Sequence, residues 1–301
     1  MFPHEVPIIE IPYGSSGVRM FIKREDLVHP DISGNKFWKL FYPVKNYLEK
    51  KVESPLFITF GGAFSNHIAA TAVLGKLYGI PSLGIIRGEE LATVWEDNPT
   101  LSLAKKNGMR LVFVSRRVYT NKSDLMQVLE KKYPQALILP EGGSSASAVK
   151  GMQHMLGDKT QGYDYLCTAV GTGGTLSGLS LYAEKNQKVV GYCVTKDRVI
   201  ERIESFTHRR NYALVEASQG GYGKVSDALV DFINHFFYEY KVILDPLYTG
   251  KMMMKIFQMI DKRMFPLGSK ILVFHTGGVQ GIGGINQARR KKKKKTINIA
   301  I

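Results

Sequence analysis

The chain has 301 residues and a formal net charge of +15, and 44% of its residues are hydrophobic against 22% charged. This length suits one large or two ordinary domains, and the apolar content is that of a soluble globular protein. No apolar run reaches the ~18 residues of a membrane span, and the N-terminus lacks the basic and apolar regions of a secretory signal, which disfavours both.

From about residue 55 onward, short apolar runs alternate with helical patterns. Strands are predicted at 56–60, 82–86, 111–114, 136–139, 165–170, 189–194, 213–216, 242–244 and 271–275. Helices are predicted at 67–78, 101–106, 123–132, 146–156, 176–184, 199–206, 226–238 and 251–264. Strands that alternate with helices of this length predict an α/β fold with parallel sheets covered by helices on both faces.

Four of the turns that follow predicted strands are rich in glycine and hydroxyl residues. They span residues 61–66, 142–145, 171–175 and 276–278. Open parallel sheets bind their ligands at the carboxyl ends of strands, where each strand turns into a helix. Four such turns at equivalent places therefore predict one shared ligand.

The clearest of these turns is Gly-Thr-Gly-Gly-Thr at 171–175, directly after a strand and before a helix. Glycines let the backbone amides turn toward a ligand, and the helix N-terminus adds partial positive charge, which favours phosphate. A dinucleotide fingerprint would need glycine at position 176, which is Leu176, and the Walker pattern is also absent. A purely structural tight turn is the alternative.

Lys36 follows Ser-Gly-Asn at 33–35 and precedes two aromatic residues, Phe37 and Trp38. One interpretation is an ordinary surface lysine. The other is a lysine whose pKa is lowered by burial or by a nearby cation, which makes its amine competent to form an imine. The local sequence leaves both open.

Cys167 and Cys193 are the two cysteines, and both lie in apolar, strand-like runs. They form neither a disulfide framework nor a zinc-ligand spacing, so we expect reduced, buried thiols, no metal site and a cytoplasmic protein. Near the C-terminus, the run from Arg289 to Lys295 supplies seven positive charges. We interpret it as a solvated face, because the rest of the chain shows no nucleic-acid-binding motif and no basic stripe with interleaved aromatics.

Six motifs occur in one order along nearly the whole chain, at residues 23–36, 61–67, 142–147, 171–175, 245–251 and 275–278. In this order the chain resembles the 1-aminocyclopropane-1-carboxylate deaminase and D-cysteine desulfhydrase family, of the tryptophan-synthase-β-like (fold type II) pyridoxal-phosphate enzymes. The resemblance implies two open, mostly parallel twisted sheets, with the active site between two domains. Residues 1–39 and 150–301 would form a large cofactor-binding domain and 40–149 a small inserted α/β domain, in a homodimer.

The resemblance also implies pyridoxal 5′-phosphate as the cofactor and assigns roles to single residues. Lys36 would hold the cofactor as a Schiff base and later act as the base at the substrate Cα. Asn66 would hydrogen-bond the cofactor 3′-oxygen, and Ser65 would meet the substrate carboxylate or assist proton transfer. Tyr222 and Tyr248 would be the family's two active-site tyrosines, although both also suit a packing role. The phosphate would lie on Gly171, Thr172, Gly173, Gly174 and Thr175.

Two positions separate the activities of the family. Thr249 and Thr276 stand where the ring-opening enzymes carry glutamate and leucine, and hydroxyl residues at both are typical of the D-cysteine desulfhydrases. A carboxylate near the pyridine nitrogen keeps it protonated and makes the ring a strong electron sink, whereas a hydroxyl makes a weaker one that suffices for β-elimination. Thr276 would thus contact the cofactor. His67, where glutamine is also familiar, would tune acid–base steps or merely pack.

We therefore predict a pyridoxal-phosphate-dependent lyase that acts on a small amino acid, converting D-cysteine to pyruvate, hydrogen sulfide and ammonia. D-serine, β-chloro-D-alanine and an L-specific or bifunctional lyase remain open within the family. Ring opening of 1-aminocyclopropane-1-carboxylate to α-ketobutyrate and ammonia is the first alternative. A protein of a different class, a non-catalytic binder of a phosphate ligand or of nucleic acid through the basic tail, is the second.

Overall fold

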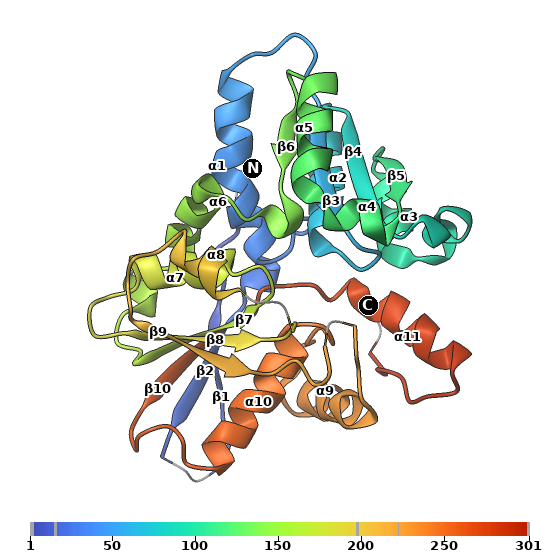
Figure 1. Cartoon of the computed structure of the whole chain (residues 1–301). Helices are drawn as coiled ribbons and strands as arrows, with labels where there is room; N and C mark the ends of the chain where they lie inside the picture. The colour runs from blue at the N-terminus through green and yellow to red at the C-terminus, as the bar shows by residue number, and fades with distance from the viewer. Residues whose placement is uncertain (1–2, 15–16, 197–198, 222, 300–301) are drawn as a thin grey trace.

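The computed structural model describes residues 3–14, 17–196, 199–221 and 223–299, and these residues form two sheets with helices around them (Figure 1). The larger sheet has the order β1-β2-β10-β7-β8-β9, formed by Ile8–Ile11, Arg19–Lys23, Lys270–Phe274, Tyr165–Val170, Lys188–Cys193 and Tyr212–Glu216. The smaller has the order β5-β4-β3-β6, formed by Arg110–Val114, Ser82–Arg87, Phe57–Gly61 and Leu137–Leu139. Every pairing is parallel except the antiparallel pair β1–β2. The predicted α/β fold with two mostly parallel sheets is confirmed.

The α-helices begin where the sequence offers capping side chains. Ser65, Asn98 and Ser226 each accept a hydrogen bond from a first-turn N–H, at the starts of α2, α3 and α9. The α-helices α1 to α11 span Asn35–Glu49, Asn66–Tyr78, Pro99–Lys106, Arg116–Thr120, Lys122–Lys132, Ala146–Gly151, Gly174–Tyr182, Ile200–Glu204, Asp227–Tyr240, Thr249–Asp261 and Gly281–Lys291. Short 3-10 helices η1 to η6 cover Glu25–Leu27, Glu89–Thr93, Trp95–Asp97, Glu141–Gly143, Met152–Met155 and Asp158–Thr160. Among the described helices none is both long and apolar enough to cross a membrane.

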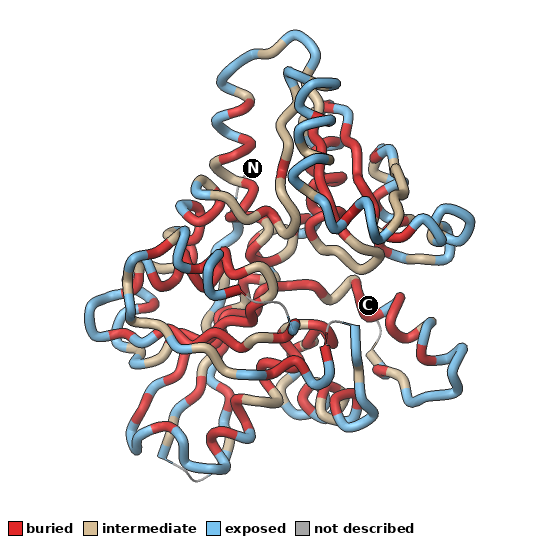
Figure 2. Tube along the Cα trace, in the orientation of Figure 1, coloured by how far each residue is buried: buried red, intermediate tan, exposed pale blue. Residues whose placement is uncertain are grey.

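Helices cover both faces of the larger sheet, because side chains along each strand alternate between its two faces. On β7, Cys167 and Ala169 pack in one core with α9 and α10, whereas Leu166 and Val170 pack in the other core with α1 and α7. Buried segments run along these central strands (Figure 2). The smaller sheet packs in the same way, with α4 and α5 on one face and α2 and α3 on the other.

One predicted strand is wrong, because residues 242–244 form an extended connection between α9 and α10 and pair with no described strand. Val242 and Leu244 are buried in the larger core, which explains their apolar character. The carbonyl of Ile243 accepts a hydrogen bond from His275 instead of from a strand partner. The apolar pattern at 242–244 thus correctly indicated that these side chains are buried, but it wrongly indicated that their backbone pairs with a strand.

The predicted division into residues 1–39 plus 150–301 and 40–149 stays a prediction. Strands β3 to β6 of the smaller sheet all fall within 40–149, and the strands of the larger sheet fall outside it. Helices α1 and α6 run without interruption across the two expected boundaries.

The basic run near the C-terminus is solvated only in part. Arg289 is buried and pairs with Asp227, and Lys295 pairs with Asp231 at 2.6 Å. Arg290 and residues 292–294 are exposed. Part of the run therefore ties the end of α11 to α9.

Candidate active site

A cavity of about 590 Å³ is lined by the carboxyl ends of strands from both sheets. All four glycine-rich turns contribute to it, through Gly62, Ser65 and Asn66, through Gly142, through Gly171 to Gly173, and through Thr276 and Gly277. The parallel strands bring these turns together although they are far apart in the chain. The cavity is therefore the place where a shared ligand would bind.

Lys36 reaches the cavity from the first turn of α1. The helix begins at Asn35, after Gly34 with a φ of 69°. A Cβ at Gly34 would lie 2.0 Å from the carbonyl oxygen of Thr276, so only glycine allows this close approach. Burial lowers the pKa of Lys36 to about 8, while the carboxylate of Asp245 acts in the opposite direction. The surface-lysine interpretation does not hold for this side chain.

The turn from Gly171 to Thr175 forms a cradle at the start of α7. Gly173 has a φ of 90°, and a Cβ at Gly174 would lie 2.6 Å from Ser144 Oγ. Asn35 Nδ2 donates a hydrogen bond to Thr175 Oγ1 at 2.7 Å, which ties the cradle to the turn that carries Lys36. The first N–H groups of a helix have no partners within it and favour an anion.

Lys39 is a residue that sequence reasoning missed. It lies one helical turn after Lys36 and is only 3% exposed. Its Nζ donates to the carbonyl oxygen of Gly142 at 3.1 Å and to Ser144 Oγ at 3.2 Å. Burial, then the charges of Lys36 and Arg202, lower the pKa of Lys39 well below its usual value. The three-residue spacing on one helix could have indicated it.

Ser65 and Asn66 lie where α2 begins, and both line the cavity. Ser65 Oγ accepts a hydrogen bond from the Ile68 N–H at 3.4 Å, so the hydroxyl caps the helix. Asn66 Oδ1 accepts a hydrogen bond from Gln280. A Cβ at Gly278 would lie 2.5 Å from Asn66 Nδ2, so the amide packs closely on that turn. Both predicted site residues therefore have structural contacts as well as a place in the cavity wall.

The two predicted tyrosines differ in what the structure describes. Tyr248 lines the cavity, and its ring would lie 3.0 Å from a Cβ at Gly171. Tyr222 lies outside the described residues. The preceding turn is anchored by the buried Lys251, whose Nζ donates to the carbonyl oxygens of Ser218 and Gly221, both at 2.8 Å.

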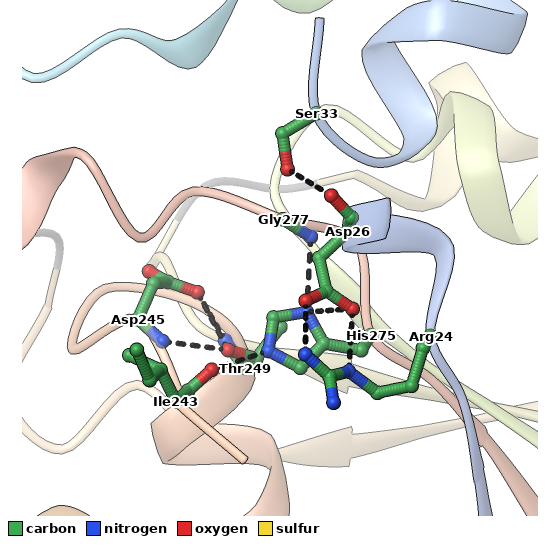
Figure 3. Close-up of polar contacts among 8 residues, drawn as sticks. All are labelled: Arg24, Asp26, Ser33, Ile243, Asp245, Thr249, His275 and Gly277. Atoms are coloured by element: carbon green, nitrogen blue, oxygen red, sulfur yellow. Dashed lines mark hydrogen bonds and ion pairs between the residues drawn. The ribbon is translucent and has the colours of Figure 1, made fainter. Parts of the chain in front are cut away.

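The two threonines expected to separate the activities have different surroundings. Thr276 lines the cavity. Thr249 is buried and is not among its lining residues. Its hydroxyl donates to Asp245 Oδ2 at 2.8 Å and accepts from the Asp245 N–H at 2.9 Å (Figure 3). Thr249 thus gives its one hydroxyl proton to Asp245, which lies just before α10.

A buried polar network supports one wall of the cavity (Figure 3). His275 Nε2 lies 2.6 Å from the carbonyl oxygen of Ile243, and His275 Nδ1 accepts from the Gly277 N–H at 3.2 Å. This pattern assigns the proton to Nε2. Asp26 lies 3.4 Å from Nδ1 and receives two hydrogen bonds from Arg24, at 2.9 and 2.7 Å. These contacts fix the strand end that carries Gly277.

A lysine amine with a lowered pKa and a phosphate cradle therefore face one cavity. A family profile described as "Pyridoxal-phosphate dependent enzyme" matches residues 2–277. The chain belongs to this family. The cofactor of the family is pyridoxal phosphate, whose aldehyde and phosphate are the two groups that these residues fit.

Relatives of the family carry two activities in their names. A Thermotoga maritima protein named "Putative 1-aminocyclopropane-1-carboxylate deaminase" is 31% identical, over 91% of this chain and 92% of its own. A mitochondrial protein of Arabidopsis thaliana named bifunctional D-cysteine desulfhydrase/1-aminocyclopropane-1-carboxylate deaminase is 26% identical, over 90% and 75%. A crystal structure described as an ACC deaminase homologue has a TM-score of 0.78 and 28% identity, and covers 93% of each chain. These relatives define the branch of pyridoxal-phosphate enzymes to which the chain is similar.

His67 is a buried histidine in the wall of this pyridoxal-phosphate site. It is 1% exposed and lines the cavity, and neither ring nitrogen has a hydrogen-bond partner among the described residues. Burial, then the charges of Lys36 and Lys39, lower its pKa well below the usual value. The Pro140 carbonyl acts in the opposite direction, although it makes no hydrogen bond of ordinary geometry with the ring. The imidazole is therefore neutral.

Proposed function

We propose that the protein eliminates the β-substituent of a D-amino acid, and that D-cysteine is its substrate, giving pyruvate, hydrogen sulfide and ammonia. One observation carries the proposal: Lys36, with its pKa lowered to about 8, faces the same cavity as the cradle of Gly171 to Thr175. An amine that is partly unprotonated near neutral pH can serve both as a nucleophile and as a base.

Several residues would hold the cofactor. The N–H groups at the start of α7 and the hydroxyls of Thr172 and Thr175 would bind its phosphate, with Lys39 beside them. Lys36 would join its aldehyde carbon, and Asn66 and Thr276 would contact its ring. Bound pyridoxal phosphate supplies an electron-withdrawing ring that stabilises the charge left at Cα when a proton is removed.

Lys36 would take the proton from the substrate Cα. A base acts best when its pKa lies close to the working pH, and burial brings the pKa of Lys36 to about 8. The carboxylate of Asp245 limits this shift. Asp245 itself accepts hydrogen bonds from the N–H groups of Leu247, Tyr248 and Thr249, so its charge is held at a fixed place.

The start of α2 would bind the substrate α-carboxylate. The first-turn N–H groups of a helix lack intrahelical partners and favour an anion. Ser65 Oγ accepts a hydrogen bond from the Ile68 N–H, and this leaves the hydroxyl proton of Ser65 for a second contact. The carboxylate would thus be held in the turn between β3 and α2.

The cavity wall favours β-elimination over ring opening. Glu141 is the one acidic residue among the described lining residues, and its two oxygens already accept hydrogen bonds from Tyr119 and Lys122. Apart from this paired glutamate, no carboxylate among the described lining residues is offered to a pyridine nitrogen, and Thr276 offers a hydroxyl instead. A weaker electron sink suffices when the leaving group is a thiolate.

The test is a comparison of substrates with the purified holoenzyme. We expect pyruvate and hydrogen sulfide from D-cysteine, at a rate well above that from L-cysteine, and little α-ketobutyrate from 1-aminocyclopropane-1-carboxylate. Ketobutyrate from the cyclopropane acid without pyruvate from D-cysteine would refute the proposal. That result would favour the activity named for the Thermotoga maritima relative.

We also propose that the enzyme is cytoplasmic and forms a homodimer. Cys167 and Cys193 are unpaired thiols, which supports a cytoplasmic location. A homodimer is supported by the family resemblance, and light scattering of the purified protein would measure its mass. A monomer of 33.7 kDa would refute this part.

A further inference from the structure

Lys251 is a buried lysine in the first turn of α10, and it is not itself a lining residue of the active-site cavity. Its Nζ donates hydrogen bonds to the carbonyl oxygens of Ser218 and Gly221, both at 2.8 Å. Burial lowers the pKa of Lys251 to about 8, and the carboxylates of Asp245 and Glu216 act in the opposite direction. At neutral pH the amine is therefore mostly protonated, and the two carbonyl oxygens face an ammonium group.

The turn that accepts these two hydrogen bonds has an unusual backbone. It runs from Ser218 to Gly221, after β9. The φ angles of its last three residues are 50°, 97° and 122°. The first of these is Gln219, which carries a side chain in a left-handed conformation that favours glycine. A backbone of this kind persists only where its surroundings hold it.

The same turn forms part of the cavity wall. Gly220 and Gly221 both line the active-site cavity, and as glycines they bring only backbone to it. The place of such a wall depends on what anchors the backbone. Lys251 lies three residues after Tyr248, which lines the cavity from the start of α10. Lys251 therefore joins this part of the wall to a turn that lies 30 to 33 residues earlier in the chain.

Lys251 supplies the buried part of this anchorage. On the exposed side of the turn, Gln219 Nε2 lies 3.1 Å from Met254 Sδ. The hydrogen bonds from Lys251 are buried and come from a charged donor, which makes them stronger than hydrogen bonds between neutral groups. We propose that Lys251 is a positioning residue for the reaction: its ammonium group holds the turn 218–221 in place as the wall that orients the amino-acid substrate.

This inference rests on the proposed function for its choice of substrate, and the role of Lys251 requires only that an amino acid reacts in this cavity. Cofactor binding should depend little on Lys251, because a different turn, Gly171 to Thr175, forms the phosphate cradle at the start of α7. Loss of the ammonium group should therefore impair the reaction of the substrate more than the binding of the cofactor. A residue that only stabilises the fold would not separate these two quantities.

The experiment uses two variants of Lys251 in the holoenzyme. Lys251→Met keeps most of the side-chain volume and removes the hydrogen bonds, and Lys251→Ala opens a space that a small amine can fill. Lys255→Met is the matched control, because Lys255 lies one turn further along α10 and also acts on the carboxylate of Glu216. We would measure kcat/KM with D-cysteine, the Kd for pyridoxal phosphate and thermal unfolding.

Chemical rescue separates the hydrogen bonds from the charge. The kcat/KM of Lys251→Ala is measured with ethylammonium or tetramethylammonium chloride at equal concentration, since both cations carry one charge and only ethylammonium can donate hydrogen bonds. The same salts are added to the wild type and to Lys251→Met, whose side chains fill the space. These two proteins correct for any reaction of the amine with the cofactor.

We expect Lys251→Met to lower kcat/KM by about 30-fold, with less than about a threefold change in the Kd for pyridoxal phosphate. Ethylammonium should restore part of the kcat/KM of Lys251→Ala, tetramethylammonium should not, and Lys255→Met should behave as the wild type. An unchanged kcat/KM in Lys251→Met, an equal loss of kcat/KM and cofactor affinity, or no rescue would overturn the inference. Unfolded Lys251 variants beside a folded Lys255→Met would also overturn it, because the lysine would then serve the fold.

A failure of the proposed function gives a different result. If the wild type converts the cyclopropane acid and not D-cysteine, the proposed elimination fails, and the same variants are compared with that acid. If it converts neither, the Kd for D-serine, measured from the change in cofactor absorbance, decides the role of Lys251. A higher Kd in Lys251→Met than in Lys255→Met would support the positioning role, and equal values would overturn it.

Discussion

The hydroxyl of Thr249 donates a hydrogen bond to Asp245 at 2.8 Å and accepts one from the Asp245 N–H at 2.9 Å (Figure 3). The single hydroxyl proton is thus committed to Asp245 and is not available to donate to a ligand. Asp245 in turn accepts from the N–H groups of Leu247, Tyr248 and Thr249 and so caps α10, the helix that follows the tyrosine of the cavity wall. Thr249 thus stabilises the turn that carries Tyr248 without lining the cavity itself, and it would influence the reaction through Tyr248.

Replacement of Thr249 by valine should therefore affect stability more than substrate choice. Valine removes both hydrogen bonds and leaves the Asp245 N–H buried without its partner, which should lower the free energy of unfolding by about 1–3 kcal/mol. Thr249→Ser, which keeps the hydroxyl, is the control. Urea unfolding measures the stability of each variant, and the ratio of the rates with D-cysteine and the cyclopropane acid measures its substrate choice. A changed ratio at unchanged stability would contradict a supporting role.

Replacement of Lys36 by alanine should abolish both the cofactor linkage and the base. We expect loss of the visible absorption band of the bound cofactor and a fall in kcat of about a thousandfold or more. Lys45→Ala, on the exposed face of the same helix, should change neither. A Lys36→Ala protein that keeps its visible band would show that another amine holds the cofactor.

The rate at which apo-protein takes up pyridoxal phosphate should follow the titration of Lys36. Only the unprotonated amine attacks the aldehyde, and burial lowers the pKa of Lys36 from 10.5 to about 8. Below pH 8 the rate should rise about tenfold per pH unit, and above it the rate should level off. Stopped-flow absorbance at pH 6 to 10 would record this profile. A rate that still climbs beyond pH 9.5 would mean that the amine keeps an ordinary pKa.

Gly174→Ala tests the cradle. The added Cβ would lie 2.6 Å from Ser144 Oγ and 3.3 Å from Lys39 Nζ, at the turn proposed to bind the phosphate. Overpacking of this kind costs about 1–3 kcal/mol, so the Kd for pyridoxal phosphate should rise by about 10-fold to 100-fold. Gly281→Ala, at the start of α11 with open space around its Cβ, should leave the Kd unchanged. Equal Kd values for the two variants would argue against phosphate binding at this turn.

Much of the fold could be predicted from local patterns. The strand at 165–170 and the helix near 67–78 were predicted almost to the residue, because apolar runs and capping residues act over short distances. Helix α1 was not predicted, since Pro43 inside it and its many aromatic residues obscure the helical period. The segment 242–244 was predicted as a strand and is not one, because its buried apolar side chains give the same sequence pattern although no strand lies beside it to pair with.

The sequence by itself determined the order of the elements, the four glycine turns and the chemical type of each group, including the amine of Lys36. Tertiary structure decided which groups are buried, paired or left free. Asn35 and Thr175 are 140 residues apart and in direct contact, and Lys39 meets Gly142 and Ser144 only because α1 packs beside that turn. Burial lowers the pKa of Lys36, and Glu141 pairs with Lys122 only because the turn after β6 lies beside α5. Desolvation and charge pairing depend on distances in space, and residues far apart in a chain acquire those distances only when it folds.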